Sequence, residues 1–215
     1  MQNHRTKLET DTSLSDFLVS PAELLAKRPD IHNIIGGALV FRQRPDNSSG
    51  EPVYETLLLK RAASDSFPLR WEVPGGTADL QVDETIIAVA ARELFEETRL
   101  QARKAVCAVG LGQSGNGSSI GSAAADGGVA MDEELEVCLL PVDGLIWAIA
   151  VFIVEVADTT TEIVLQDEEH EDWAWVTEAE VERRKFHGQS DGSLECVTEA
   201  MRMIVLEGFR LRREF

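Results

Sequence analysis

The stretch that decides the fold runs from residue 71 to residue 97 and reads WEVPGGTADLQVDETIIAVAARELFEE. It ends in a helical pattern that carries three acids, Glu93, Glu96 and Glu97. On a helix that advances about 100° per residue, Glu93 and Glu97 share a face and Glu96 flanks them. Acids gathered in this way repel one another unless they bind a divalent cation, and carboxylate oxygens favour Mg²⁺ or Mn²⁺ over zinc. The stretch therefore predicts a metal site on a helix that follows a glycine turn.

The same stretch resembles the Nudix box, G-x5-E-x7-R-E-U-x-E-E-x-G-U, in which U is a bulky apolar residue. A solvated, salt-bridged surface helix is the alternative interpretation, but it explains neither so many adjacent acids nor the preceding Pro-Gly-Gly turn. Two features depart from the box: Glu84 lies eight rather than six residues after Gly76, and the second glycine is Arg99. The matching positions are Glu84, Arg92, Glu93, Leu94, Glu96, Glu97 and Leu100.

The resemblance implies a fold and a division of the chain. The expected fold class is α/β, a Nudix-type α/β/α sandwich with a mixed sheet. We expect an N-terminal tail and short helix over residues 1–32 and a Nudix hydrolase domain over residues 33–215.

The resemblance also implies roles for the residues of the box. Glu93 and Glu97 are expected to be inner-sphere ligands of Mg²⁺ or Mn²⁺, with Glu96 as a further ligand or a ligand of a second ion and the Gly75 carbonyl as a backbone ligand. Arg92 is expected to orient the glutamates. Glycines at 75 and 76 are expected to let the backbone approach the ion and to take positive φ.

The general base is expected to be either Glu97 or an acid of a later loop, residues 166–172. In that loop the candidates are Glu168 and Glu169, which precede a strand and could reach the metal from opposite the helix. His170 is interpreted as a surface residue, because one histidine among acids is more often solvated than catalytic.

Arg99 is the departure with the clearest physical consequence. Glycine at this position ends a helix in left-handed geometry without strain, whereas arginine should cost about 1 kcal/mol or end the helix differently. Together with the two extra residues between Thr77 and Asp83, it keeps an inactive variant of the family under consideration.

The composition of the chain limits the classes of function that it can have. The chain has 215 residues, with 44% hydrophobic and 27% charged, which is typical of a globular protein. No apolar run approaches the roughly 20 residues of a membrane span, and the N-terminus has no secretory pattern. The net charge of -18 argues against a nucleic-acid polymer or an anionic membrane as partner, although a metal can still attract a small diphosphate. Three widely spaced cysteines favour reduced thiols and a cytoplasmic location.

Patterning along the chain predicts the elements around the box. Asp83 is the expected N-cap of the acidic helix, whose apolar stripe, Phe95 included, should pack on the sheet while the acids face away from the core. The Gly- and Ser-rich segment 112–128 predicts a long loop, and Asp143-Gly144 predicts a hairpin turn. Strands are expected at residues 34–41, 54–61, 105–111, 136–140, 147–156 and 173–176, and helices at residues 20–27, 177–186 and 193–213.

These patterns predict metal-dependent hydrolysis of the diphosphate linkage in a small X-linked nucleoside or prenyl diphosphate. A non-catalytic Nudix-fold module that binds a nucleotide or regulates a partner is the alternative. A Nudix-like isoprenyl diphosphate isomerase is disfavoured, because it would need a catalytic cysteine and glutamate with a His-rich metal site, and Cys107 and four scattered histidines do not make one. The apolar strands and the C-terminal helix are compatible with a homodimer.

Overall fold

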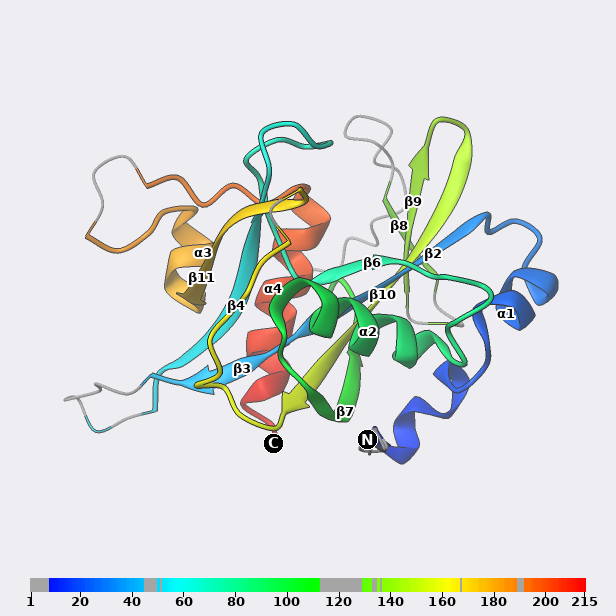
Figure 1. Cartoon of the computed structure of the whole chain (residues 1–215), viewed down its shortest axis with the longest axis horizontal. Coiled ribbons are helices and arrows are strands. Elements are labelled where there is room, and N and C mark those ends of the chain that lie inside the picture. The colour runs from blue at the N-terminus through cyan, green and yellow to red at the C-terminus, as the bar shows by residue number, and fades with distance from the viewer. Residues whose placement is uncertain are drawn as a thin grey trace.

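The structure is a computed structural model, and Figure 1 shows the arrangement of its elements. The predicted loop 112–128 lies outside the described residues apart from Gly112. The residues described are 8–44, 50, 52–112, 129–132, 135, 137–166, 168–188 and 192–215.

The larger sheet is mixed. Strands β10 and β2 are parallel, as are β1 and β7, whereas the remaining pairs are antiparallel. The strands of its main path, in spatial order, are β1 (Glu9–Thr10), β7 (Ala102–Val109), β10 (Leu145–Val156), β2 (Asn33–Leu39) and β6 (Gly75–Thr77). Strand β9 (Val137–Val142) pairs with the first half of β10, and β8 (Ala130–Asp132) pairs with β9.

The smaller sheet lies beside the larger one (Figure 1) and is antiparallel. Its strands are β11 (His170–Thr177), β4 (Tyr54–Arg61) and β3 (Phe41–Gln43), with β5 (Trp71–Glu72) also paired to β4. The strand predicted over residues 34–41 is therefore two strands. The chain passes from the larger to the smaller sheet at Val40, whose carbonyl accepts hydrogen bonds from Thr56 and Leu57 of β4.

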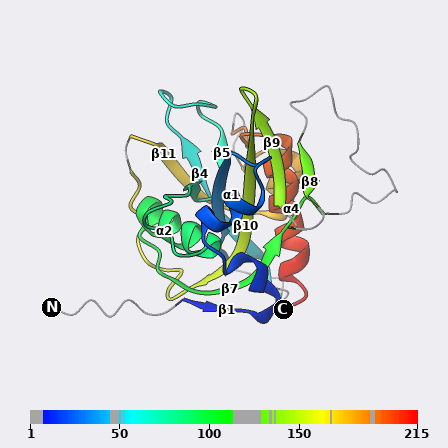
Figure 2. The ribbon, with the colours of Figure 1, turned by 90° about the vertical axis from the view of Figure 1, so that its right-hand side faces the viewer.

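Strand β10 is central, as its apolar character predicts. Successive residues of a strand point to opposite faces, so an apolar strand can serve two cores. Helix α2 (Ile86–Thr98) covers one face and α4 (Glu199–Arg212) the other, and Figure 2 shows the two helices on opposite sides of β10. On the α2 side lie Ala148, Ala150 and Phe152, and on the α4 side lie Ile149, Val151 and Ile153.

Helix α2 packs closely on β2 because β2 carries glycine at the crossing. A Cβ added at Gly36 would lie 2.8 Å from the Ala90 nitrogen and 2.8 Å from Val89 Cβ. This contact brings the backbone of α2 against the sheet and fixes where the acids of the helix emerge.

The N-terminal segment packs into the same core as α2. A 3-10 helix, η1 (Thr12–Phe17), leads to α1 (Pro21–Lys27). Ser20 is the N-cap of α1 and Pro21 lies in its first turn, as predicted. Ser20 also forms a capping box with Glu23. Phe17 makes an edge-to-face contact with Phe152 of β10 at 5.0 Å between ring centroids.

The C-terminal region confirms one local prediction and corrects another. Thr177 caps α3 (Glu178–Arg183) in a capping box with Glu180, as expected. The helix predicted from residue 193 begins instead at Glu199, because residues 193–198 form isolated bridges at Ser193 and Cys196 followed by a bend. That segment hydrogen-bonds to both sides of Trp71, through the Glu195 carbonyl and the Val197 N–H.

The β9–β10 connection is the hairpin that Asp143-Gly144 predicts, with φ of 51° at Asp143 and 80° at Gly144. Among the helices of the described residues, none is both long enough and apolar enough to span a membrane.

Candidate active site

The acidic helix begins two residues later than predicted. Thr85 is the N-cap of α2 and its side chain accepts the Ala88 N–H at 3.1 Å, so the N-cap assignment to Asp83 is wrong. Asp83 is buried and binds Arg92 through two hydrogen bonds, from Nε at 3.0 Å and from Nη2 at 2.9 Å. Its carboxylate also accepts the Asp79 N–H, so it ties the extended loop to the helix.

Arg92 is the cation around which the acids of α2 are arranged. Its Nη1 donates to Glu93 Oε1 at 2.8 Å and to Glu96 Oε2 at 2.9 Å, and its Nη2 donates to the Thr77 carbonyl at 3.1 Å. The hydrogen bonds to Asp83 and the adjacent acids raise the pKa of Arg92, so it stays charged. Arg92 thus contacts two of the glutamates that it is expected to orient.

Glu97 is buried, contrary to the expectation that all the acids face away from the core. Its residue exposure is 3%, and its Oε2 accepts the Gly75 N–H at 2.8 Å. Burial raises the pKa of Glu97 well above its ordinary value, and the charges of Glu72, Glu93 and Glu169 raise it further. The expectation fails because β6 and β11 cover this face of α2, which a helical pattern cannot reveal.

The three acids of α2 differ in their contact with water. The Glu93 side chain is 13% exposed, and burial raises its pKa, although Arg92 opposes the shift. Glu96 is 43% exposed. Phe95, predicted to pack on the sheet, is instead 41% exposed and lies beneath the Arg99 guanidinium.

Gly75 and Gly76 lie in extended β6, so the expected positive φ is wrong. Their need for glycine is steric: a Cβ at Gly76 would lie 2.5 Å from Glu93 Cδ, and one at Gly75 would lie 2.7 Å from the Gly36 carbonyl oxygen. Gly75 pairs with Gly37 between the ladder bonds Ala38 N–Pro74 O and Ala78 N–Ile34 O. At such a position the backbone polar groups point away from the partner strand, and the Gly75 N–H accordingly donates to Glu97 of α2.

A second set of candidate residues reaches α2 from the opposite side. Ligand atoms of Glu97, Glu169 and His170 all lie within 4.8 Å of one another. Glu169 is exposed, whereas Glu168, in the turn just before it, is exposed but not part of this group. The structure thus brings Glu169 to the acids of the helix and leaves Glu168 at the surface.

His170 is buried, with 2% exposure, so its interpretation as a surface residue is wrong. Its Nε2 lies 3.2 Å from Glu72 Oε1, and Glu72 also accepts from Arg61 at 2.5 Å. Neither Glu72 nor His170 was predicted as a site residue. Strand alternation could have pointed to Glu72, because successive side chains of a strand point to opposite faces and Trp71 occupies the buried face.

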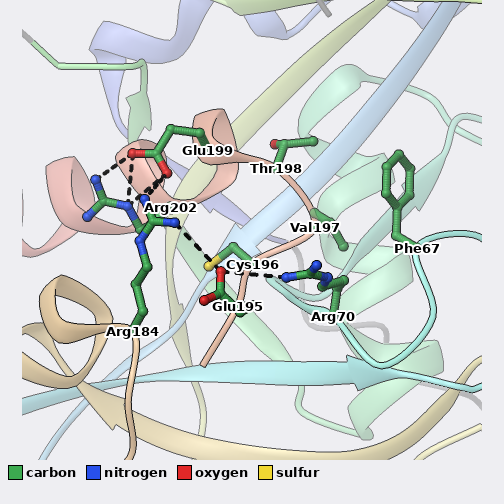
Figure 3. A pocket seen from close by; sticks show the side chains of 9 residues that line it. All are labelled: Phe67, Arg70, Arg184, Glu195, Cys196, Val197, Thr198, Glu199 and Arg202. Atoms are coloured by element: carbon green, nitrogen blue, oxygen red, sulfur yellow. Dashed lines mark hydrogen bonds and ion pairs between the residues drawn. The ribbon is translucent and has the colours of Figure 1, made fainter. Parts of the chain in front are cut away.

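A hollow of about 250 Å³, drawn in Figure 3, is lined by none of the residues of this acidic group. Arg184 and Arg202 bind Glu199 there at 2.7 Å and 2.5 Å. The positive charge of the arginines in this pocket is therefore largely compensated by the acids of the pocket. The residues that line it are Phe67, Arg70, Arg184, Glu195, Cys196, Val197, Thr198, Glu199 and Arg202.

The donor set around Glu97 fits a hard divalent cation. Buried carboxylates of like charge are destabilised unless a cation or a proton offsets them. Glu97 has three acidic neighbours, which raise its pKa. Among the described residues, the hydrogen bond from the Gly75 N–H lowers it. Carboxylate oxygens with a backbone carbonyl are ligands that Mg²⁺ and Mn²⁺ accept.

A family model described as the NUDIX domain matches residues 37–195. The chain belongs to the Nudix family. The expectation of a Nudix pyrophosphohydrolase is thereby confirmed at the level of the family. A search of the curated proteins found no match.

Solved structures with a similar fold include a Caenorhabditis elegans Ap4A hydrolase binary complex, with 16% identity and a TM-score of 0.51 over 86% of this chain and 100% of that one. A MutT protein from Methanosarcina mazei has 18% identity and a TM-score of 0.51 over 86% and 98% of the two chains. The Nudix domain of Shewanella oneidensis NrtR, in complex with ADP-ribose, has 18% identity and a TM-score of 0.50 over 90% and 99%. The likeness confirms the α/β/α sandwich.

Within the Nudix box, Arg99 keeps the backbone geometry that glycine would adopt. It is the C-cap of α2 with φ 65° and ψ 8°, and its N–H bonds to the Phe95 carbonyl at 2.9 Å. The helix therefore ends in the left-handed conformation despite the side chain, and the acids of the box keep their place.

Proposed function

We propose that this chain hydrolyses the diphosphate linkage of a small nucleoside diphosphate derivative with Mg²⁺ or Mn²⁺ as cofactor. The observation that carries the proposal is the convergence of Glu97 of α2 with Glu169, which lies just before β11, with Glu93 close enough for its charge to act on Glu97. Acids brought together in this way, with Glu93 held by Arg92 and Glu97 held by the Gly75 N–H, are suited to bind a cation beside a phosphate.

The residues that would hold the cation are Glu93, Glu96, Glu97 and the Gly75 carbonyl. When bound, a divalent cation offsets charge on the diphosphate oxygens and lowers the pKa of bound water. Arg92 holds Glu93 and Glu96 in place, and the Gly75 N–H holds Glu97. Ligands that are oriented before substrate arrives need little reorganisation during the reaction.

We assign the general base to Glu169, with Glu168 and Glu97 as the other candidates. Glu169 combines two properties that a base requires: its carboxylate lies in the group formed with Glu97, and it is exposed, so it can return a proton to water. Glu168 is exposed without that proximity, and Glu97 has the proximity without the exposure.

Two similar structures support a nucleoside as the group X. One is an Ap4A hydrolase and another holds ADP-ribose. We infer that nucleoside diphosphate derivatives, including dinucleotides, are the first substrate class to test and that prenyl diphosphates are the second. With a net charge of -18, the chain offers an anionic substrate little attraction outside the site itself.

The alternative is a non-catalytic Nudix module that binds a nucleotide without turnover. It rests on Arg99 and on the two extra residues of the box, and the structure accommodates both. Helix α2 ends in left-handed geometry at Arg99, and Asp83 of the extended stretch binds Arg92. We therefore rank this alternative second.

The test is to incubate the purified protein with nucleoside, sugar, dinucleotide and prenyl diphosphates in Mg²⁺, Mn²⁺ or EDTA and to quantify the products. We expect cleavage that requires metal and is abolished in Glu97→Gln, while the control Glu162→Gln, at an exposed position, retains it. Saturable binding of metal and nucleotide without any cleavage would instead establish the non-catalytic module.

A further inference from the structure

His170 presents one of its two ring nitrogens to the acidic site with no partner. The side chain is 2% exposed, and among the described residues its Nδ1 has no hydrogen-bond partner. This nitrogen lies 3.9 Å from Glu97 Oε1, beyond hydrogen-bond distance. A buried polar atom without a partner costs free energy, so the position calls for a ligand.

The other ring nitrogen is already engaged. His170 Nε2 lies 3.2 Å from Glu72 Oε1, and Glu72 is fixed in turn by Arg61. A carboxylate only accepts, so Nε2 carries the hydrogen in the neutral ring, and Nδ1 is left with its lone pair. This is the arrangement in which a carboxylate orients a histidine for metal binding and sets its tautomer.

The lone pair of Nδ1 therefore faces other electron-pair donors. Ligand atoms of His170, Glu97 and Glu169 lie within 4.8 Å of one another. A metal ion with ligands at about 2.1 Å can join atoms up to about 4.2 Å apart, which includes the 3.9 Å separation of Nδ1 and Glu97 Oε1. The group as a whole needs only a small closure to surround one cation.

We propose that His170 is a nitrogen ligand of the metal site, oriented by Glu72 and acting with Glu97 and with one oxygen of Glu169, whose other oxygen stays free to act as the base. The inference rests on the proposed function, because it assumes that the acids around Glu97 bind a cation. It adds a metal preference, because an imidazole nitrogen is a poor ligand for Mg²⁺, whereas the first-row cations accept nitrogen ligands in an order that begins with Mn²⁺. Of the two cations, the site should therefore favour Mn²⁺ over Mg²⁺ through this nitrogen.

The decisive measurement is pulsed electron paramagnetic resonance of Mn²⁺ bound to the tag-free full chain, with histidine side chains labelled with ¹⁵N, in a buffer without imidazole. We expect hyperfine coupling from a histidine nitrogen. His170→Gln should abolish the coupling, because glutamine can keep a contact to Glu72 but has no atom equivalent to the lone pair of Nδ1. The matched control His187→Gln, at an exposed histidine, should retain it.

Metal titrations give a second readout. In His170→Gln the Mn²⁺ affinity should fall about tenfold or more, and the Mg²⁺ affinity should fall less. Wild-type protein that binds Mn²⁺ without histidine coupling, or fails to bind it, overturns the inference, as does coupling that persists in His170→Gln. Turnover separates the two proposals: coupling without hydrolysis overturns only the proposed function, and metal-dependent hydrolysis without coupling overturns only this inference.

Discussion

Glu97 is a buried acid with acidic neighbours. From this environment we predict how the stability of the folded protein depends on pH. Burial and the charges of Glu72, Glu93 and Glu169 raise its pKa above 4.5, the ordinary value. The charged form therefore destabilises the metal-free folded state. This cost is absent below pH 4.5, grows as the pH rises toward the folded-state pKa, and is complete above it.

We expect Glu97→Gln to be more stable than the wild type in EDTA at pH 8, with the difference vanishing toward pH 4. Glutamine retains an oxygen that can accept the Gly75 N–H, so the hydrogen bond at 2.8 Å survives. Urea unfolding across this pH range measures the effect, with Glu162→Gln as the exposed control. Added Mn²⁺ should stabilise the wild type and not the variant. Equal stability of variant and wild type at every pH in EDTA would contradict the electrostatic account.

Arg99 is a second single residue with a measurable consequence. Its left-handed backbone costs about 1 kcal/mol for a residue with a Cβ. Arg99→Gly should therefore raise the free energy of unfolding by about 0.5–1 kcal/mol. Arg99→Ala is the matched control, because it keeps the strain and removes the guanidinium from the Phe95 ring. If Arg99→Gly and Arg99→Ala have the same free energy of unfolding, measured by heat or urea, the left-handed backbone at residue 99 carries no strain.

At the scale of elements, the site depends on how closely β6 lies against α2. A Cβ at Gly76 would lie 2.5 Å from the Glu93 carboxyl carbon. The clash falls on the end of a flexible side chain, so Gly76→Ala should displace Glu93 while changing the free energy of unfolding by less than about 1 kcal/mol.

The expected functional result of Gly76→Ala is a loss of metal affinity and turnover of about tenfold or more. Thr77→Ala, at the next and exposed residue of β6, is the control and should retain both. Isothermal titration with Mn²⁺ and the diphosphate assay measure the effect. Wild-type metal affinity in Gly76→Ala would show that Glu93 is not a ligand.

At the scale of the whole molecule, the N-terminal segment and the central sheet share one core. Phe17 is 7% exposed and packs on Phe152, which is fully buried. Phe17→Ala should therefore lower the free energy of unfolding by about 3 kcal/mol. Leu18→Ala, at a neighbouring side chain that is 49% exposed, should change it by less than about 0.5 kcal/mol. Similar values for the two variants in urea unfolding would show that residues 8–32 are a detachable appendage.

Features that depend on local spacing follow from the sequence. The N-cap at Ser20, the capping box at Thr177, the hairpin turn at Asp143-Gly144 and the central position of β10 were all predictable, because each depends on residues close together in the sequence. The acids of α2 belong to this class as well. Their i, i+4 spacing places them on one face of a helix wherever that helix is packed.

Features that depend on distant parts of the chain arise only on folding. Residues 193–198 have an apolar pattern that suits a helix, yet they are not helical, and Glu195 and Val197 hydrogen-bond to the Trp71 backbone instead. Asp83 looks like an N-cap, yet Arg92 binds it from two turns along the helix. In both places a partner remote in sequence outweighs the local preference.

The same division applies to the site. The acids on α2 follow from the sequence. The packing of β5, β6 and β11 around the helix, by contrast, buries Glu97 and places His170 and Glu72 beside it. Spacing determines which side chains share a face. Burial, and with it the pKa of an acid and the unpartnered state of a histidine nitrogen, depends on what the rest of the chain places over that face, because desolvation is set by every neighbouring atom.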